Sequence, residues 1–262
     1  NTNDSILDLN KSLCQNGFTV SIDKNTVVES PIEILFISNT ETNFSQYRNL
    51  ISIAENAEVK FVERIQNINN SSSFVNNFTR INCDKNTKIE YNKIQNNTSE
   101  SQLIDTVNVY QEQDSTCDIN TLIFGGSFTR NNLNFEQNGF NCESNMNGVS
   151  VLDNNQLADN HTFVDHKSAN CRSNEMYKGI YLDNSKGVFN GKIMVRPDAQ
   201  KIDAFQSNNN LLLSENSSID SKPQLEIYAD DVKCSHGCTI GQLDKNALFY
   251  MRSRGIGIEE AN

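Results

Sequence analysis

The sequence predicts an all-β fold, built as one long parallel β-helix (β-solenoid) with short helical segments at its ends. Residues 57–61, 87–91 and 117–121 share a pattern: a small residue, a charged one, a β-branched one, a polar one, and then an aromatic residue or Thr. Their starts are spaced thirty residues apart, and a turn containing Asn or Asp precedes each of them. A regular period of strand and turn, without helical segments between, predicts a solenoid. The abundant asparagine agrees with this because Asn side chains can hold stacked turns together. A β-sandwich with coincidental spacing is the alternative.

Residues 1–16 are predicted to be an N-terminal helical remnant. Residues 4–15 carry an apolar face of helical spacing, Asn3 or Asp4 can cap the start, and Gly17 suits the position just after the end.

The β-helix core is predicted over residues 17–243, without a linker to a second domain. Alternating apolar and polar residues at 18–22 and 32–37 indicate its first strands. Further short strands separated by Asn, Ser, Asp and Gly turns are expected at residues 148–152, 179–182, 188–195, 202–205 and 211–213.

A second helical region is predicted over residues 244–262. Asp244 can cap its first helix, Ala247 and Met251 share a face, and Gly255 suits its C-terminal stop. We expect this to be the start of a C-terminal helical region that the chain cuts short.

Composition excludes several classes of function. The net charge of −11 argues against a general nucleic-acid binder, since phosphate affinity requires a basic surface. No apolar run is long enough to predict a membrane span, and position 1 is not Met, as expected for a trimmed chain. The seven cysteines include no CxxC pair, which favours reduced thiols. Most are expected in the core: Cys14, Cys83, Cys117, Cys142 and Cys171.

The densest candidate chemistry lies in residues 222–255, around Cys234, His236 and Cys238. Thiols and imidazole at alternate positions of a strand fall on one face and could bind iron, zinc or an iron–sulfur species. Alternate side chains of a flat strand project in parallel, so a site shared with a partner chain is easier to form than a closed one. We expect Gly237 to break the strand. A cysteine facing the core beside a hydrogen-bonded histidine is the alternative.

Two other groups are weaker candidates. His161, Asp165 and His166 follow Asp159 closely and could form a metal or acid–base site, although His166 should face away from the other two on a strand. Polar residues stacked on the turns of a solenoid are the alternative reading. The Asp230–Asp231 pair resembles the acid–base sites of β-helix enzymes that act on polysaccharides, so a carbohydrate-active enzyme is the alternative function.

Several motifs together resemble the SufB/SufD family, the scaffold proteins of the SUF iron–sulfur cluster assembly system. They cover about half of the chain, and the last is the most specific: residues 125–133, 159–166, 173–179, 187–195, 197–200, 209–214 and 222–256. Within the family, Ser235 and Gly237 around the histidine, and Met251 in place of a cysteine, are similar to the SufD branch rather than to the SufB branch.

The resemblance implies a right-handed β-helix without turnover of its own. It implies pairing with SufB and with the ATPase SufC, which binds through the C-terminal helical region; in isolation, a homodimer is a further possibility. It places Cys234 and His236 at a cluster-assembly site near the SufB interface, whereas Cys238 stands where many members have Ala. His161, Asp165 and His166 would then support the fold or form a secondary site. The implied cofactor is a transient iron–sulfur cluster in the complex, with none tightly bound to the isolated chain. The implied compartment is the bacterial cytoplasm, or a plastid in a eukaryote.

Overall fold

The computed structural model describes residues 4–38, 42–67, 72–257 and 260, and within them it forms two parallel β-sheets and two short helices. Sheet A contains β1 (Thr19–Ile22), β3 (Thr42–Ile53), β5 (Ser72–Cys83), β7 (Ser101–Gln111), β9 (Phe128–Gln137), β11 (Leu157–His166), β13 (Lys186–Val195) and β15 (Ser218–Ile227). Sheet B contains β2 (Ile32–Ser38), β4 (Glu58–Asn67), β6 (Lys88–Gln95), β8 (Thr116–Ile123), β10 (Glu143–Leu152), β12 (Arg172–Tyr181), β14 (Ile202–Leu212) and β16 (Val232–Gln242). The helices are α1 (Ser5–Leu13) and α2 (Lys245–Ser253).

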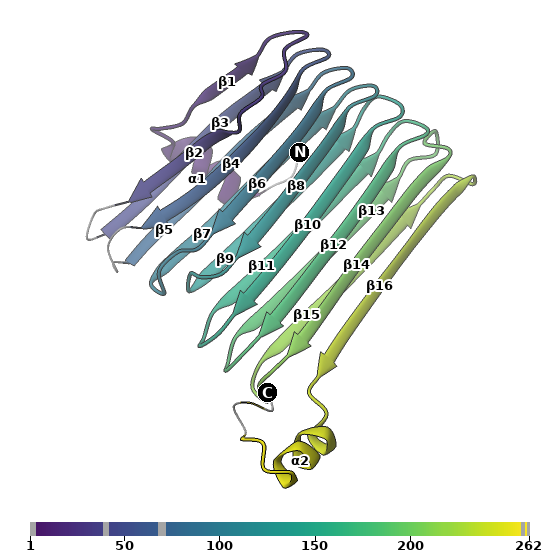
Figure 1. The fold of residues 1–262 in the computed structure, drawn as a ribbon. Helices are drawn as coiled ribbons and strands as arrows, with labels where there is room; N and C mark the ends of the chain where they lie inside the picture. The colour runs from purple at the N-terminus through teal and green to yellow at the C-terminus, as the bar shows by residue number, and fades with distance from the viewer. Residues whose placement is uncertain (1–3, 39–41, 68–71, 258–259, 261–262) are drawn as a thin grey trace.

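The chain winds between the two sheets. Odd-numbered strands pair only with odd-numbered ones and even-numbered strands only with even-numbered ones, always in parallel. Each turn of the winding therefore adds one strand to each sheet, as Figure 1 shows. This confirms the predicted parallel β-helix and excludes the β-sandwich.

The thirty-residue repeat holds for the first interval but not for the second. Glu58 pairs with Lys88, thirty residues later, whereas Lys88 pairs with Thr116, twenty-eight residues later. The third predicted unit was therefore placed two residues out of register. The prediction still gave the correct inner face, because a slip of two residues leaves every side chain on the same side of a strand.

The turns at one corner are held together by a column of asparagines. Asn25, Asn56 and Asn86 have φ of 60°, 63° and 55°, the left-handed conformation that Asn tolerates better than most residues. Nδ2 of Asn56 donates to Oδ1 of Asn25, and Nδ2 of Asn86 donates to Oδ1 of Asn56, both at 2.8 Å. Asparagine holds the stacked turns together, as predicted, but its partners in this column are other asparagine side chains and not the neighbouring backbone that we expected.

We expect Asn56→Ala to lower the free energy of unfolding by about 1–2 kcal/mol, because it removes two side-chain hydrogen bonds and leaves a β-carbon in a left-handed conformation. Asn56→Gly removes the same bonds without the steric cost and should lose about 1 kcal/mol less. Denaturant titration of both variants measures the difference. Equal losses would show that the conformation at residue 56 contributes nothing.

Alternate residues of every strand point into the solenoid and form its core. Apolar side chains fill much of the interior, where Phe61 packs against Tyr91 and Tyr177 packs against Phe189 as tilted ring pairs. Four of the five cysteines expected in the core, Cys83, Cys117, Cys142 and Cys171, are buried there. Cys14 is the exception, because it follows the end of α1 and is partly exposed.

A charged cluster interrupts the apolar interior. Nζ of Lys93 contacts the Asp105 carboxylate and lies 3.8 Å from Oε1 of Glu63. Tyr91 donates to Glu63 at 2.7 Å, and Gln95 donates to Asp105 at 3.1 Å. All five side chains are almost completely buried, so each charge depends on these partners for its solvation.

Helix α1 lies against sheet A. Asp4 caps it, as predicted, by accepting from the amides of Ile6 and Leu7, whereas Asn3 lies outside the described residues. The side chain of Asn10 is buried and donates to the backbone oxygen of Asn76 at 2.8 Å, which fastens α1 to β5. Gly17 does not follow the helix as its stop. It lies against Arg48, where an added β-carbon would come within 1.8 Å of the backbone oxygen, so its role is close packing of two chain segments.

Helix α2 extends beyond the last strand (Figure 1). Asp244 caps its start and Gly255, at φ +89°, follows its end, as predicted. The amide of Gly255 donates to the backbone oxygen of Arg252, and the amide of Ile256 donates to that of Met251. These are the paired bonds of a Schellman motif. Among the described residues, no helix combines the length and the apolar character that a membrane span requires.

Candidate functional site

Cys234, His236 and Cys238 lie on β16, the last strand of sheet B (Figure 1). Their neighbours in the parallel ladder are Ala204, Gln206 and Asn208 of β14. Those three neighbours are buried inside the solenoid, and side chains at paired positions point the same way. Cys234, His236 and Cys238 therefore share one strand face, as the sequence predicted, and the structure shows that this face points inward. The predicted break at Gly237 is wrong: β16 runs through it, because the ladder to β14 continues on both sides and Gly237 keeps its pairing with Ser207.

This part of the solenoid is open. Sheet A ends at β15 and sheet B at β16, so within the described residues no further turn covers these two strands. As a result His236 and Cys238 are exposed although they face inward, while Cys234 is partly buried against the core cluster that contains Ala204. Burial raises the pKa of the Cys234 thiol, and the nearby Asp203 carboxylate raises it further.

The spacing of these side chains limits what they can bind. Alternate residues of a strand lie about 7 Å apart, whereas two ligands of one zinc or iron ion each lie about 2.0–2.3 Å from it. The three side chains also leave the strand in parallel. Among the described residues, no group of three or more Cys, His, Asp or Glu side chains converges as a metal site.

A polar column lies directly beneath His236. In register below it are Gln206 of β14 and Glu175 of β12, both with no exposed surface. Nε2 of Gln206 donates to Oε2 of Glu175 at 2.8 Å, and Thr162 of β11 donates to the same oxygen at 2.6 Å. Burial raises the pKa of Glu175 to about 7, although both hydrogen bonds act in the opposite direction.

The aspartates and histidines of β11 do not converge. Nε2 of His161 lies 2.8 Å from Asp159, whose other oxygen accepts from Arg130, and Asp165 accepts two bonds from Arg196 at 2.9 and 3.0 Å. His166 faces the interior, on the opposite side of the strand from His161 and Asp165 as predicted, and its Nε2 lies 3.0 Å from Oγ of Ser173. These side chains therefore form separate polar contacts on the two faces of the strand.

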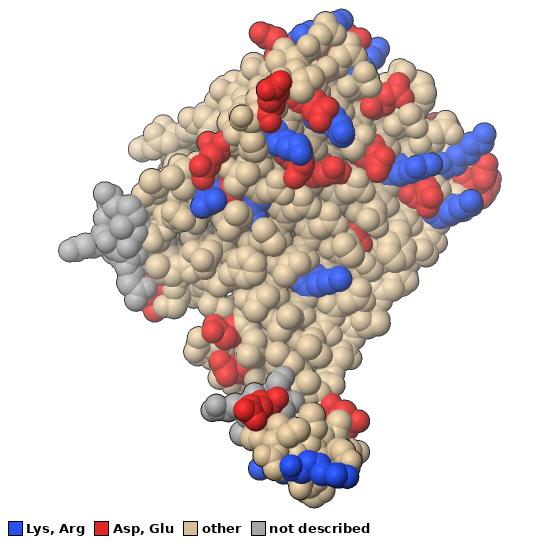
Figure 2. All heavy atoms as spheres, viewed as in Figure 1, with Lys and Arg blue, Asp and Glu red and all other residues tan. Residues whose placement is uncertain are grey.

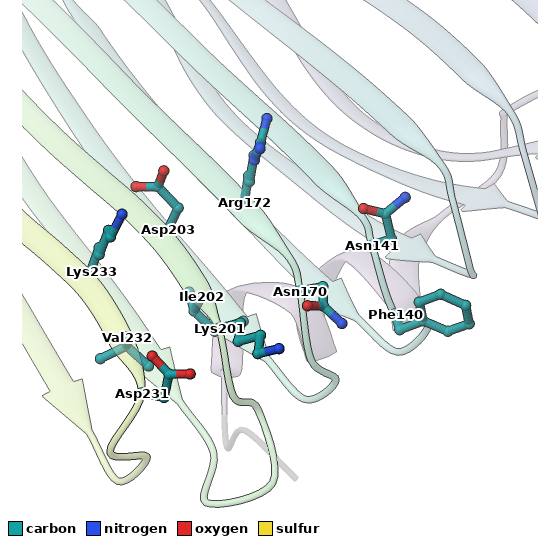
Figure 3. A pocket seen from close by; sticks show the side chains of 10 residues that line it. All are labelled: Phe140, Asn141, Asn170, Arg172, Lys201, Ile202, Asp203, Asp231, Val232 and Lys233. Carbon is teal, nitrogen blue, oxygen red and sulfur yellow. The ribbon is translucent and has the colours of Figure 1, made fainter.

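The Asp230–Asp231 pair is also divided. Asp231 lines a hollow of about 600 Å³ on the outside of the solenoid, and Asp230 is not among its lining residues. Figure 3 shows Arg172, Asp203 and Lys233 on neighbouring strands of that hollow. These three are in register, so cations and a carboxylate alternate across the ladder, an arrangement that stabilises strand pairing. The hollow thus lacks the row of carboxylates expected of a polysaccharide-cleaving groove.

Charged side chains are unevenly distributed on the surface. In the view of Figure 2 they gather along the upper turns and on α2, while much of the face between is uncharged. Exposed apolar side chains occur toward the open part of the solenoid, with Phe205 and Met176 on the outer face of sheet B and Ile227 and Ile240 on β15 and β16. A surface of this kind favours contact with another protein.

Sequence reasoning located the cysteines and the histidine but missed Glu175 and Gln206. A signal was present for Glu175, because Ser173, Glu175 and Tyr177 alternate along one strand face. A charged residue between two positions of an inward face indicates a buried carboxylate. No comparable signal existed for Gln206, since its position beneath His236 follows from the strand register alone.

Fold and candidate site together define a parallel β-helix protein that carries cysteine and histidine side chains at its open part. The family described as "SUF system FeS cluster assembly, SufBD core domain" matches residues 36–262. The chain therefore belongs to the SufBD family of the SUF system, which supports a role in iron–sulfur cluster assembly.

Individual relatives agree. The chain is 32% identical to the iron–sulfur cluster assembly protein SufD of Escherichia coli, over 97% of this chain and 61% of that protein. It is 30% identical to a SufBD family protein of Synechocystis, over 99% and 59%, and 29% identical to the chloroplastic protein ABCI7 of Arabidopsis thaliana, over 92% and 53%. The chain thus spans about three-fifths of the length of the first two of these relatives and about half of the third.

Proposed function

We propose that this protein is a non-catalytic scaffold that supplies Cys234 and His236 to a cluster-assembly site formed with a partner chain. The observation that supports this proposal is that both side chains lie on a terminal strand, face the open interior and do not converge on one another. Such residues are half of a site. A cluster has several irons that separate ligands can reach, so a spacing of about 7 Å suits a cluster better than a single ion.

SufB is the proposed partner at the open part of the solenoid. β15 and β16 each have a paired strand on one side only, within the described chain, so both leave backbone hydrogen-bonding groups free along their other edge. Edges of this kind accept a strand from another chain. The exposed side chains of Ile227 and Ile240 lie on these same two strands and would be covered by it.

We further propose that the ATPase SufC binds through the helical region that begins at α2. The chain spans about three-fifths of the length of the first two relatives. The cluster is cargo, held transiently in the complex and passed on. Cys238 is exposed on the same strand and is an additional candidate ligand of this site. The proposed compartment is the bacterial cytoplasm, or the plastid in a plant, as the name of the Arabidopsis relative says of that protein.

The test is His236→Ala in the protein assembled with SufB and SufC. We expect iron and sulfide in the purified complex to fall by about tenfold or more, because a ligand or an essential neighbour of the cluster is lost. The matched control is His161→Ala, which removes an imidazole from the outer face of β11, where it contacts Asp159. The control should retain the cluster.

Size-exclusion chromatography must show that both variant complexes remain intact. An intact His236→Ala complex with an unchanged iron and sulfide content would overturn the assigned role. Failure of the wild-type protein to bind SufB, or its assembly only as a homodimer, would overturn the proposed partner.

A further inference from the structure

The column of side chains that ends at His236 changes character along the solenoid. In sheet B the successive in-register positions are Phe61, Tyr91, Ile119, Met146, Glu175, Gln206 and His236. The first four are buried aromatic or aliphatic side chains, and the last three are polar. Exposure does not explain the change, because Glu175 and Gln206 are as deeply buried as the apolar members.

Burying Glu175 and Gln206 at these positions costs free energy of folding. No cation contacts Glu175 in the described structure, and its Oε1 has no hydrogen-bond partner there. Oε1 of Gln206 is likewise buried without a partner. A buried polar atom without a partner costs free energy, so each one calls for a specific explanation.

The amide of Gln206 is held in one orientation. Glu175 accepts through Oε2, so the nitrogen of the Gln206 amide must face it, and the amide oxygen is turned away. Across the interior, Gly191 leaves the space that this amide occupies, since an added β-carbon would lie 2.2 Å from Nε2 of Gln206. The facing residues Gly191 and Pro223 carry no side-chain donor. The ladder neighbour of Gln206 on the next turn is His236, whose ring can donate.

We infer that Gln206, anchored by Glu175, is the positioning residue of His236. No bond joins the two side chains in the described structure, but the exposed imidazole can turn about its side-chain torsions until one ring nitrogen donates to Oε1 of Gln206, which fixes the tautomer of the ring. The other nitrogen is then unprotonated and directed away from the solenoid, toward the partner chain. A histidine that binds a metal requires this arrangement, because a hydrogen bond at one ring nitrogen decides which nitrogen is the ligand. The inference rests on the proposed function for its purpose, but its geometry can be tested without a cluster.

The test is nuclear magnetic resonance of the ring nitrogens in the intact protein without SufB or SufC. The chain has three histidines, so three ring spectra must be assigned. At pH 8.5, where an ordinary imidazole is neutral, we expect His236 to show one dominant tautomer. In Gln206→Met the tautomer ratio should shift about fivefold toward that of a free imidazole, the change that a hydrogen bond of ordinary strength supports.

A second variant protects the test from misfolding. Gln206→Met alone leaves the buried Glu175 without its amide partner. The double variant, Glu175→Met together with Gln206→Met, also removes the carboxylate and extends the apolar column that ends at Met146. Both variants should change the His236 signals alike, and those of His161 and His166 should keep their wild-type tautomers. An unchanged His236 tautomer ratio in both folded variants would overturn the inference.

The outcome also separates this inference from the proposed function. A tautomer shift in Gln206→Met with normal cluster assembly in His236→Ala would support the positioning contact and overturn the cluster role. An unchanged tautomer ratio in Gln206→Met, with loss of the cluster in His236→Ala, would overturn the positioning contact and support the cluster role.

Discussion

Lys93→Met is expected to lower the free energy of unfolding by about 3–5 kcal/mol, the loss that follows when one partner is removed from a buried ion pair. Lys93 is almost completely buried and contacts Asp105, with Glu63 at 3.8 Å. Met fills a similar volume, so the loss comes from charge rather than from packing. Two carboxylates would remain in the interior without a cation.

The pH dependence of this loss identifies its cause. Burial raises the pKa of Glu63 to about 7, and the attraction of Lys93 acts against that rise. Without Lys93 the Glu63 carboxylate must take up a proton to stay buried, which costs little free energy at pH 5 and more at pH 8. The destabilisation measured by denaturant titration should therefore be larger at pH 8 than at pH 5.

Lys88→Met provides the control. Lys88 lies 3.7 Å from Glu58, and both side chains are exposed, so its removal should cost no more than about 1 kcal/mol. A similarly small loss for Lys93→Met, or one of equal size at pH 5 and pH 8, would contradict the account of the buried cluster.

Glu175→Gln is expected to remove a pH-dependent loss of about 3 kcal/mol in the free energy of unfolding. Burial raises the pKa of Glu175 from its ordinary value of 4.5 to about 7 in the folded protein. The folded state therefore binds more protons than the unfolded state between these values. The stabilising contribution of the protonated carboxyl is complete below pH 4.5 and is lost as the pH rises through 7. At about 1.4 kcal/mol per unit, the difference amounts to about 3 kcal/mol.

The Gln side chain can replace Glu175 without disturbing its donors. Thr162 and Gln206 both donate to the same oxygen, Oε2, so an amide oxygen at that place accepts both bonds. The stability of Glu175→Gln relative to wild type should rise by about 2–3 kcal/mol between pH 4.5 and pH 8. Glu100→Gln, at an exposed turn, controls for the loss of one negative charge. Parallel stability curves for Glu175→Gln and wild type across this range would show that Glu175 does not titrate in the folded protein as described.

The two predictions concern different kinds of buried charge. Lys93, Glu63 and Asp105 solvate one another and belong to the framework. Glu175 has hydrogen bonds but no cation, and it lies two turns below His236. The second arrangement reduces stability at neutral pH, which is expected where a polar group serves the site rather than the fold.

Much of the fold followed from local sequence. Alternating residues fixed the inner and outer faces of the strands, and the turn asparagines indicated the stacked corner, because both depend on backbone geometry within a few residues. Asp4 and Asp244 marked the helix starts for the same reason. Gly17 misled because its close contact is with Arg48, a residue distant in sequence.

The candidate site, too, followed partly from local sequence and partly from the tertiary structure. The sequence by itself determined that Cys234, His236 and Cys238 share one strand face, and the family resemblance led to the proposal that Cys234 and His236 serve cluster assembly. Only the tertiary structure decided that this strand is the last of its sheet and that Gln206 and Glu175 lie beneath His236. The period of a strand fixes which way a side chain points. The neighbours of that side chain come from strands about thirty residues away in the sequence. The length of the intervening turn varies from one winding to the next, and it sets which residues pair.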